Sequence, residues 1–429
     1  MRVVMRYGKR GLNLDLPDDV KATVIHKKRM PVASDKEGAV RSALAKPVGC
    51  RPLREEARGC KNVCICICDI TRPVPNGTVL PVLLDRLIEA GVSAESITIL
   101  VATGLHRPNE GEELAELVGS DRVLATVRAV NHFARNEDDH VFLGTTSCGM
   151  PVKLDRRFVE ADMRIVTGLV EPHFMAGYSG GRKVIVPGVA YEETIRYLHS
   201  TGMLIHEMCD NTILEGNPLH GAQIEATRMV GKTFAVNTVI DEERRLSYVN
   251  FGMLEESHLA AVAFARPYFE IPLDRRFKTV VTSSAGYPLD RNYYQTVKGM
   301  VGVTGIVSPG SDIFIASECA EGLGAPEFAV SQERFIAEGT DAFLARTLGQ
   351  SCAAIDEWET VMQIKAMKLA AIHLYSDRLT PEQKTLTGVD CVESLSDAVA
   401  ECLKRKGDRE VAIVPEGPYV IPVSTGGCV

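Results

Sequence analysis

The sequence is poor in aromatic residues, has no long apolar run and carries no excess of basic charge. Aromatic side chains make up 6% of the 429 residues, and there is one tryptophan. No segment approaches the roughly 20 consecutive apolar residues that a membrane-spanning helix needs, so we expect no membrane insertion. Acidic side chains outnumber basic ones by 56 to 48, which gives a net charge of −8. Because a protein that binds nucleic acid needs a basic surface, we expect no such partner.

The sequence also has little of what marks a secreted protein. Its first residues, MRVVMRYGKRGLNLDLP, contain neither the apolar core nor the small-residue cleavage site of a signal peptide. Twelve cysteines in 429 residues are too few for a scaffold held together by disulfides. We therefore expect a cytoplasmic protein with reduced cysteines.

Strand-like runs alternate with helical patterns, which predicts β-α-β units and largely parallel sheets. The pattern forms two blocks, so we predict two α/β domains, residues 1–270 and 271–429, joined near Phe264–Lys278. The last residues are expected either to complete the second domain or to pack back on the first, and residues 1–50 carry little signal. The predicted strands are Cys64–Cys68, Ile97–Ala102, Arg164–Thr167, Thr279–Ser283, Ile313–Ala316, Leu369–Leu374 and Val411–Val414, and the predicted helices include Val79–Ala90 and Glu110–Val118.

Three of the cysteines, Cys64, Cys66 and Cys68, alternate along the first predicted strand. At the strand period of two their thiols share one face, which would suit a soft metal or a redox site. A buried parallel strand would also contain such small apolar side chains. We favour the buried strand, because no histidine or fourth cysteine lies nearby with the spacing of a zinc site.

Polar motifs follow the predicted strands directly. In open α/β sheets the ligands bind beyond the carboxyl ends of the strands, so these motifs are expected to converge. If the two sheets face each other, the active site lies in a cleft between the domains. The motifs are Asp69–Pro73, Thr103–Pro108, Gly168–His173 and Ala176–Lys183 in the first domain, and Ala285–Asp290, Tyr293–Lys298 and Glu321–Gly324 in the second.

The glycine-rich segment Gly177–Lys183 is similar to a phosphate-binding loop, since glycines let backbone N–H groups approach an anion. It is not a Walker A loop, because the glycine spacing differs and Val184 follows the lysine. A tight turn with an exposed lysine is the alternative. However, Lys183 leads into an apolar segment, and a partly desolvated lysine is a plausible nucleophile or covalent anchor.

Histidines are the next candidates. His106 and His173 follow strands, whereas His199 lies in a helical pattern where most histidines are structural. Two neutral imidazoles near one ligand would suit proton transfer on both faces of a substrate. With His199 they could instead form a three-histidine metal site. Arg72 and Lys298 could bind a carboxylate, although most such cations are solvated or structural.

Taken together and in order, these motifs resemble the lactate racemase family that uses a nickel-pincer nucleotide. The resemblance extends over roughly residues 60–325, so it is more specific than any single motif. The segments that carry it are Asp69–Pro73, Thr103–Pro108, Glu171–Lys183 and Tyr294–Lys298.

The resemblance implies a cofactor of the nickel pyridinium-3,5-bisthiocarboxylic acid mononucleotide type, joined to Lys183 through a thioamide. It also implies enzymes that make this cofactor as partners, since the chain alone would be an apoprotein. His199 would ligate the nickel, and His106 and His173 would be the acid–base pair. Substrate would be held by Arg72, Tyr294, Gln295 and Lys298, and the nucleotide by Asp69, Thr71, Ser179, Gly180 and Gly181.

The implied activity is racemisation or epimerisation of a small anionic 2-hydroxy acid, such as lactate or a larger acid. Removing the proton of the hydroxyl-bearing carbon is difficult, whereas hydride transfer to a pyridinium-like acceptor gives a planar 2-keto acid that can be reduced from its other face. Two other functions stay open. One is a three-histidine zinc hydrolase, and the other is a nucleotide-binding protein without catalytic activity.

Overall fold

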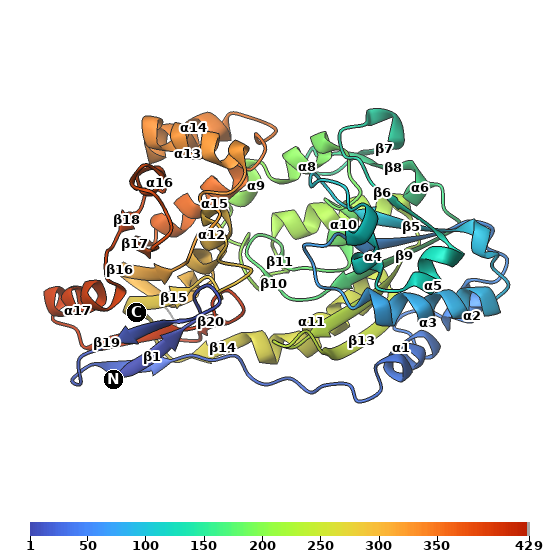
Figure 1. Ribbon diagram of the computed structural model, residues 1–429. Coiled ribbons are helices and arrows are strands. Elements are labelled where there is room, and N and C mark those ends of the chain that lie inside the picture. The colour runs from blue at the N-terminus through green and yellow to red at the C-terminus, as the bar shows by residue number, and fades with distance from the viewer. Residues whose placement is uncertain (427–429) are drawn as a thin grey trace. The chain divides into compact units, whose positions relative to one another are not determined.

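The computed structural model describes residues 1–426 and divides into two compact units (Figure 1). We call Arg29–Leu198 together with Leu214–Arg266 the central unit. The C-terminal unit combines Met1–Lys28, His199–Ile213 and the chain from Pro267 onward. Both units are α/β structures with largely parallel sheets, as the alternation of strands and helices predicted.

The central unit is built on a six-stranded sheet with the order β13-β12-β9-β4-β5-β6. All neighbours are parallel except β12 and β13, which form an antiparallel hairpin. Two short antiparallel pairs, β7-β8 and β10-β11, accompany the sheet. The strands are β4 (Val63–Cys68), β5 (Ile97–Ala102), β6 (Arg128–Asn131), β7 (His140–Thr145), β8 (Pro151–Asp155), β9 (Met163–Leu169), β10 (Pro172–His173), β11 (Gly177–Tyr178), β12 (Phe234–Ile240) and β13 (Leu246–Met253).

Helices cover both faces of this sheet. Ile65 and Ile67 of β4 pack with apolar residues of α1 to α5 in one core. Figure 1 shows α1 to α3 close together beside the sheet. The alternate residue Cys66 points to the other face, where its thiol lies 4.0 Å from the Val184 carbonyl of α7. The helices are α1 (Lys36–Ala45), α2 (Leu53–Glu56), α3 (Asn76–Glu89), α4 (Gly111–Val118), α5 (Asp121–Thr126), α6 (Arg156–Val159), α7 (Arg182–Ile185), α8 (Glu192–Leu198), α10 (Pro218–Val230) and α11 (Leu254–Phe269).

The C-terminal unit has a six-stranded parallel sheet with the order β18-β17-β16-β15-β19-β3. Its strands are β1 (Arg2–Met5), β2 (Leu12–Asp15), β3 (Lys21–Val24), β14 (Glu270–Leu273), β15 (Phe277–Ser283), β16 (Val307–Ala316), β17 (Ala370–Tyr375), β18 (Asp390–Cys391), β19 (Glu410–Val414) and β20 (Ile421–Ser424). Its helices are α9 (Thr201–Leu204), α12 (Tyr293–Val301), α13 (Pro326–Glu338), α14 (Thr340–Leu348), α15 (Glu357–Met367), α16 (Pro381–Leu386) and α17 (Leu395–Lys406).

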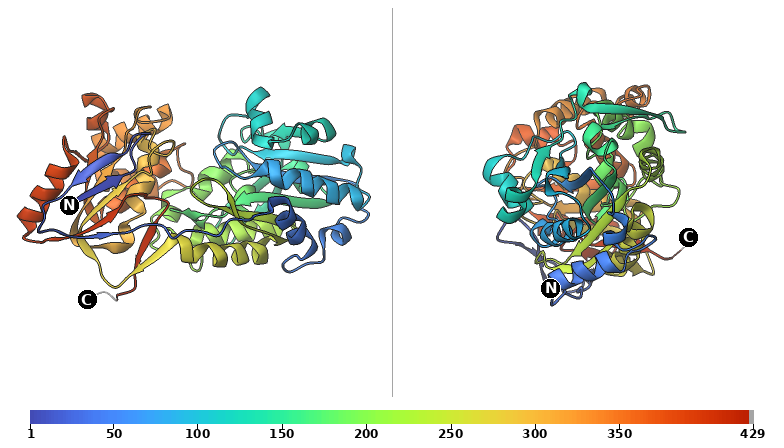
Figure 2. Two further views of the ribbon diagram at one scale, coloured as in Figure 1. Left: turned by 60° about the horizontal axis from the view of Figure 1, so that its bottom comes forward. Right: turned by 90° about the vertical axis from the view of Figure 1, so that its right-hand side faces the viewer.

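The ends of the chain meet in this unit. Strand β3 pairs in parallel with β19, and the first strands of the chain lie beside its C-terminal segments (Figure 2). The hairpin β1-β2 packs its buried side chains, such as Met5 and Leu14, with α17 and the sheet. Residues 1–28 therefore belong to the C-terminal unit, whereas the predicted division at residue 270 placed them in the first domain. The last strand, β20, pairs in parallel with β14 of the same unit. Within residues 1–426, no helix combines the length and apolar character that a bilayer crossing requires.

Candidate active site

The carboxyl ends of β4 and β5 bring Asp69 and His106 together. The two strands are parallel neighbours, and the loops that follow them carry these residues. Asp69 is buried, and its Oδ2 lies 2.6 Å from Nδ1 of the exposed His106 ring. The Thr71 hydroxyl donates to Oδ1 of the same carboxylate at 2.6 Å. Burial acts to raise the pKa of Asp69, but the bonds from His106 and Thr71 outweigh it and hold the pKa below its ordinary value.

This contact fixes the tautomer of His106. An ionised carboxylate can only accept a hydrogen bond, so Nδ1 of His106 carries the proton that Asp69 accepts. In the neutral ring, Nε2 is then the basic nitrogen. His106 is therefore arranged to accept a proton at Nε2.

His173 has the opposite arrangement. It ends the short strand β10, and its Nδ1 accepts the backbone N–H groups of Met175 at 3.3 Å and Ala176 at 3.2 Å. Because Nδ1 is the acceptor, Nε2 carries the proton of the neutral ring. His173 is therefore arranged to donate a proton at Nε2. In their neutral forms, His106 can thus accept a proton at Nε2 and His173 can donate one.

The loop between β11 and α7 is held by its glycines and by Ser179. Gly180 and Gly181 have φ values of +77° and +50°, which favour glycine. The Ser179 hydroxyl donates to the Leu169 carbonyl at 2.6 Å and accepts the Glu171 N–H at 3.1 Å, so it ties the loop to the end of β9. The half-buried Lys183 follows in α7.

The buried side chain of Arg182 holds this loop in place through hydrogen bonds. Arg182 is 1% exposed, and its Nη2 donates to the Ala176 carbonyl at 2.7 Å. Its Nη1 lies 3.0 Å from Nε2 of His258, which in turn lies 2.8 Å from the Ser179 carbonyl. Among residues 1–426 no carboxylate forms an ion pair with Arg182, and burial lowers its pKa to about 9. Arg182 belongs to the predicted motif Ala176–Lys183 but was assigned no role, and His258 was not predicted to be part of the site.

Arg72 is already paired with an acid. Its Nη1 donates to Oε1 of Glu171 at 2.8 Å, and both side chains are partly exposed. A guanidinium has five N–H donors, so this ion pair leaves several for a ligand. Glu171 belongs to the predicted motif, but its role in orienting Arg72 was not predicted.

The remaining predicted residues belong to the C-terminal unit. Asn292 caps α12 by accepting the Gln295 N–H at 3.1 Å. One turn farther along the helix, Nζ of Lys298 donates a hydrogen bond back to Oε1 of Gln295. Tyr294 accepts a hydrogen bond of 3.0 Å from Nε1 of Trp358 on α15. The predicted residues of this unit are His199, Tyr294, Gln295 and Lys298.

Trp358 links His199 to these residues. The two rings lie 4.9 Å apart between centroids, and the indole also contacts Tyr294 as described. Sequence reasoning missed Trp358, although it is the one tryptophan of the chain. His199 and α15 thus share the C-terminal unit, whereas Lys183, 16 positions before His199, lies in the central unit.

The cysteines of β4 do not offer a metal site. Burial raises the pKa of Cys64 and of Cys68 to about 12, and that of Cys66 also lies well above its ordinary value. Metal ligation requires the thiolate, so these groups are poor ligands at neutral pH. This agrees with the prediction that they belong to a buried strand.

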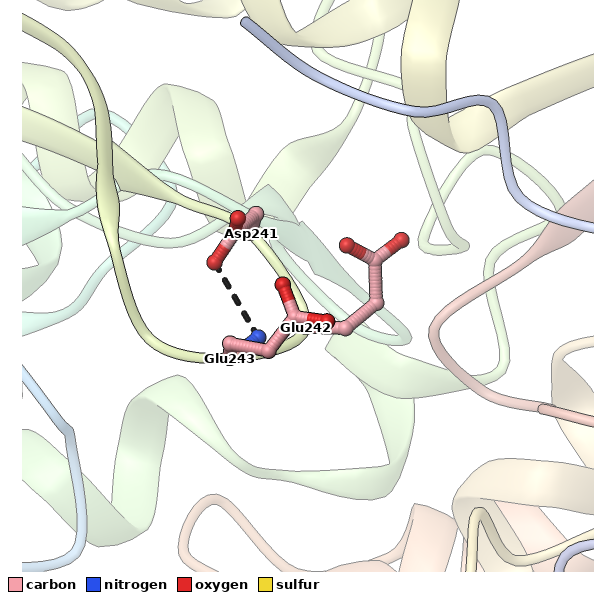
Figure 3. Close-up of side chains that lie close together, drawn as sticks. All are labelled: Asp241, Glu242 and Glu243. Atoms are coloured by element: carbon pink, nitrogen blue, oxygen red, sulfur yellow. Dashed lines mark hydrogen bonds between the residues drawn. The ribbon is translucent and has the colours of Figure 1, made fainter. Parts of the chain in front are cut away.

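Within residues 1–426, one group of three possible metal ligands lies close together, Asp241, Glu242 and Glu243 in the β12-β13 hairpin (Figure 3). Asp241 accepts the Glu243 N–H at 3.0 Å and the Arg245 Nε–H at 2.7 Å. These bonds account for the cluster as a hairpin turn, and it includes none of the predicted site residues.

Comparison with known proteins covers nearly the whole chain. Residues 7–210 match the family model of the lactate racemase N-terminal domain, and residues 274–422 match that of the C-terminal domain. A lactate racemase of Thermoanaerobacterium thermosaccharolyticum is 32% identical, with 97% of each chain covered. One of Lactiplantibacillus plantarum is 29% identical, with 97% of this chain and 98% of the relative covered.

Solved structures give the same result. The lactate racemase apoprotein from Thermoanaerobacterium thermosaccharolyticum superimposes with a TM-score of 0.90 at 30% identity, covering 98% of this chain and 100% of that one. A crystal structure of a protein from Thermotoga maritima shares the fold, with a TM-score of 0.67 at 19% identity over 91% of this chain and 98% of its own. Because both family models and a whole-chain relative match it, this chain belongs to the lactate racemase family.

Proposed function

We propose that this protein is an isomerase that inverts the hydroxyl-bearing carbon of a lactate-like 2-hydroxy acid. Whole-chain relatives named lactate racemase support this activity. The observation that carries the proposal is the opposite arrangement of His106, which accepts a proton at Nε2, and His173, which donates one. Racemisation needs this pair, because the substrate hydroxyl loses its proton on one face and regains one on the other.

The cofactor that we propose is a nickel-pincer nucleotide joined to Lys183, with His199 as the protein ligand of nickel. When bound, it supplies an acceptor and donor of hydride for the substrate carbon. The available side chains fit this group. Imidazole suits nickel, and the buried cysteines of β4 are unsuitable as thiolate ligands of a metal.

The protein's own residues manage protons and charge in this scheme. Asp69 keeps Nε2 of His106 basic and stabilises the imidazolium after it takes the hydroxyl proton. Arg72 and Lys298 bind the substrate carboxylate, and Gln295 and Tyr294 orient the acid. Asp69, Thr71, Ser179, Gly180 and Gly181 shape the loops that we assign to the nucleotide.

The test is a comparison of the wild-type chain with Lys183→Ala, both produced together with enzymes that make the cofactor. We expect the wild type to gain the mass of the cofactor and one nickel, and to convert one lactate enantiomer into the racemate. The variant should lose both properties. Lys61→Ala, an exposed lysine of the same unit, is the control and should retain them.

Two results would favour other functions. Stoichiometric zinc without added mass at Lys183, together with no racemisation, would support the hydrolase. Nucleotide binding without exchange of the substrate Cα hydrogen would support a binding protein.

A further inference from the structure

Asn217 joins helix α10 to the loop that follows His173. It is the capping residue directly before α10 and is 2% exposed. Its Oδ1 accepts the N–H groups of Leu219 at 3.0 Å and His220 at 3.2 Å, and its Nδ2 donates to the carbonyl of Met175 at 2.9 Å. A helix cap needs only the oxygen, so capping does not explain the bond from Nδ2 to a loop 42 positions earlier.

The orientation of this amide is fixed by its surroundings. If the amide were turned over, its NH2 group would face the two helix N–H groups, and its oxygen would face the Met175 carbonyl. Donors would then meet donors, and an acceptor would meet an acceptor. Asn217 therefore presents an N–H group to Met175 for as long as it caps α10.

The Met175 carbonyl and the Ala176 N–H belong to one peptide group. That N–H donates to Nδ1 of His173 at 3.2 Å, so a single peptide links the Asn217 amide to the histidine ring. A peptide group whose carbonyl accepts a hydrogen bond becomes a better N–H donor, because hydrogen bonds in a chain polarise one another. Asn217 thus strengthens the contact that keeps a proton off Nδ1 of His173.

A second side chain holds the next peptide group of the same loop. Nη2 of Arg182, in α7, donates to the Ala176 carbonyl at 2.7 Å. Met175 and Ala176 are buried, so a carbonyl that lost its side-chain partner would have little access to water in its place. His173, Arg182 and Asn217 all belong to the central unit. Helices α7 and α10 therefore fix the loop beside the His173 ring.

We propose that Asn217 is a positioning residue for His173. Its amide N–H holds the peptide group between Met175 and Ala176, so that Nδ1 of the histidine stays an acceptor and Nε2 carries the proton of the neutral ring. Asn217 acts through this peptide group and the ring of His173. The inference rests on the proposed function, because it takes His173 as an acid–base residue.

The experiment compares the cofactor-loaded wild type with Asn217→Asp and Asn217→Ser. Both replacements supply an oxygen that caps α10, and neither has an amide N–H for the Met175 carbonyl. We expect kcat for lactate to fall roughly five- to tenfold in both, as for the loss of one neutral hydrogen bond, while KM and nickel content change by less than about twofold. Circular dichroism establishes that the variants are folded. Serine adds no charge, so it keeps the test valid if the buried aspartate prevents folding.

Nitrogen-15 NMR of the histidine-labelled full chain reads the ring without turnover. The signals of His173 are those that His173→Gln lacks, and we expect its Nδ1 signal to move in both Asn217 variants. Ser120→Ala is the control, because Ser120 caps α5 of the same unit by accepting the Val123 N–H. It removes a helix cap elsewhere, so kcat and the Nδ1 signal of His173 should stay as in the wild type.

A wild-type kcat in the folded Asn217 variants, or an unmoved Nδ1 signal of His173, would overturn the inference. An equal fall of kcat in Ser120→Ala would overturn it as well, since the loss of a helix cap would then explain the effect. If the wild type racemises no 2-hydroxy acid, the proposed function fails, and the NMR signal alone decides whether Asn217 positions the ring of His173.

Discussion

Local hydrogen bonds favour opposite neutral tautomers of His106 and His173, although the residues are of one type. Asp69 holds the proton on Nδ1 of His106, and two backbone N–H groups keep it off Nδ1 of His173. Both bonds come from loops at strand ends, where a rigid sheet positions them. Because the pKa of Asp69 lies below its ordinary value, it stays ionised as the pH falls toward the usual range of a carboxyl group.

Asp69→Asn tests this arrangement. Asparagine keeps the shape but loses the charge, and it can present an N–H to Nδ1 and so favour the wrong tautomer of His106. We expect kcat for lactate to fall roughly 100-fold or more while the cofactor still binds. The measurement is racemisation by the loaded variant, with nickel content determined on the same sample.

Asp85→Asn is the matched control, because Asp85 forms an exposed ion pair with Arg122 in the same unit. Such pairs contribute little to stability, so activity should be unchanged. If Asp69→Asn racemised lactate at the wild-type rate with full cofactor, Asp69 would have no role in orienting His106.

The candidate site was predictable where its residues are local to strand ends. His106, His173 and Asp69 follow predicted strands, and parallel strands bring such ends to one edge. Trp358 was not predictable, since it meets α12 only through the packing of α15, more than 50 positions away. Nothing local in a helix indicates which distant helix it will contact.

At the scale of elements, the turn from β11 into α7 depends on backbone conformations that only glycine adopts easily. A Cβ at Gly181 would lie 2.9 Å from Cδ2 of the buried His258 ring, and one at Gly180 would lie 2.8 Å from Cγ2 of Val170. The loop has no space to relax, because Arg182 and His258 fix it from inside. Its shape, and with it the position of Lys183, is therefore set by packing.

Gly181→Ala should lower the free energy of unfolding by about 1–3 kcal/mol through strain at positive φ, before the steric clash is counted. It should also reduce the fraction of Lys183 that carries the cofactor. Urea denaturation and intact-protein mass measure these two effects.

Gly221→Ala is the control, since Gly221 lies inside α10 of the same unit with no atom within 4 Å of the added methyl group. It should gain about 0.5–1 kcal/mol because alanine is the better helix former. Equal stability of the Gly181 and Gly221 variants would contradict the account of the loop.

The sequence predicted three of the six strands in the central sheet and four of the six in the C-terminal sheet, but not the hairpin β12-β13. Strand β12 is buried along its whole length, so it lacks the alternation that marks an antiparallel strand with one exposed face. Its neighbour β13 is buried only in part, so the two strands of the hairpin have different burial patterns. The physical reason is that burial, which the sequence pattern reports, does not specify the direction of a strand.

At the scale of the whole molecule, the C-terminal unit is completed by the first residues of the chain. Strand β3 supplies one edge of its sheet, and the β1-β2 hairpin buries Val3, Met5 and Tyr7 against it. The sequence could not indicate this, because β3 is four residues long and its partner β19 lies nearly 390 positions later. A short strand carries no signal for a partner at that separation.

Deletion of residues 1–28 should destabilise the C-terminal unit selectively. It exposes β19 and the apolar side chains that the hairpin covers, so we expect faster hydrogen exchange in β19 and early proteolysis of this unit. The central unit should be less affected, because its sheet contains no strand from this segment.

Val4→Thr is the control, since Val4 lies on β1 but is 62% exposed. Hydrogen exchange followed by mass spectrometry reads both units in one experiment. Unchanged protection of β19 after the deletion would show that the N-terminal segment is dispensable to the fold.

The pairing of β3 with β19 also has a consequence for the order in which the protein is made. Residue 24 leaves the ribosome long before residue 410, and at about 5–20 residues per second the interval is roughly 20–80 s. Throughout that time β3 has no partner strand, whereas every segment of the central unit, from Arg29 to Arg266, is synthesised within the interval. The nascent C-terminal unit therefore has to protect or shield its first strands until translation is nearly finished.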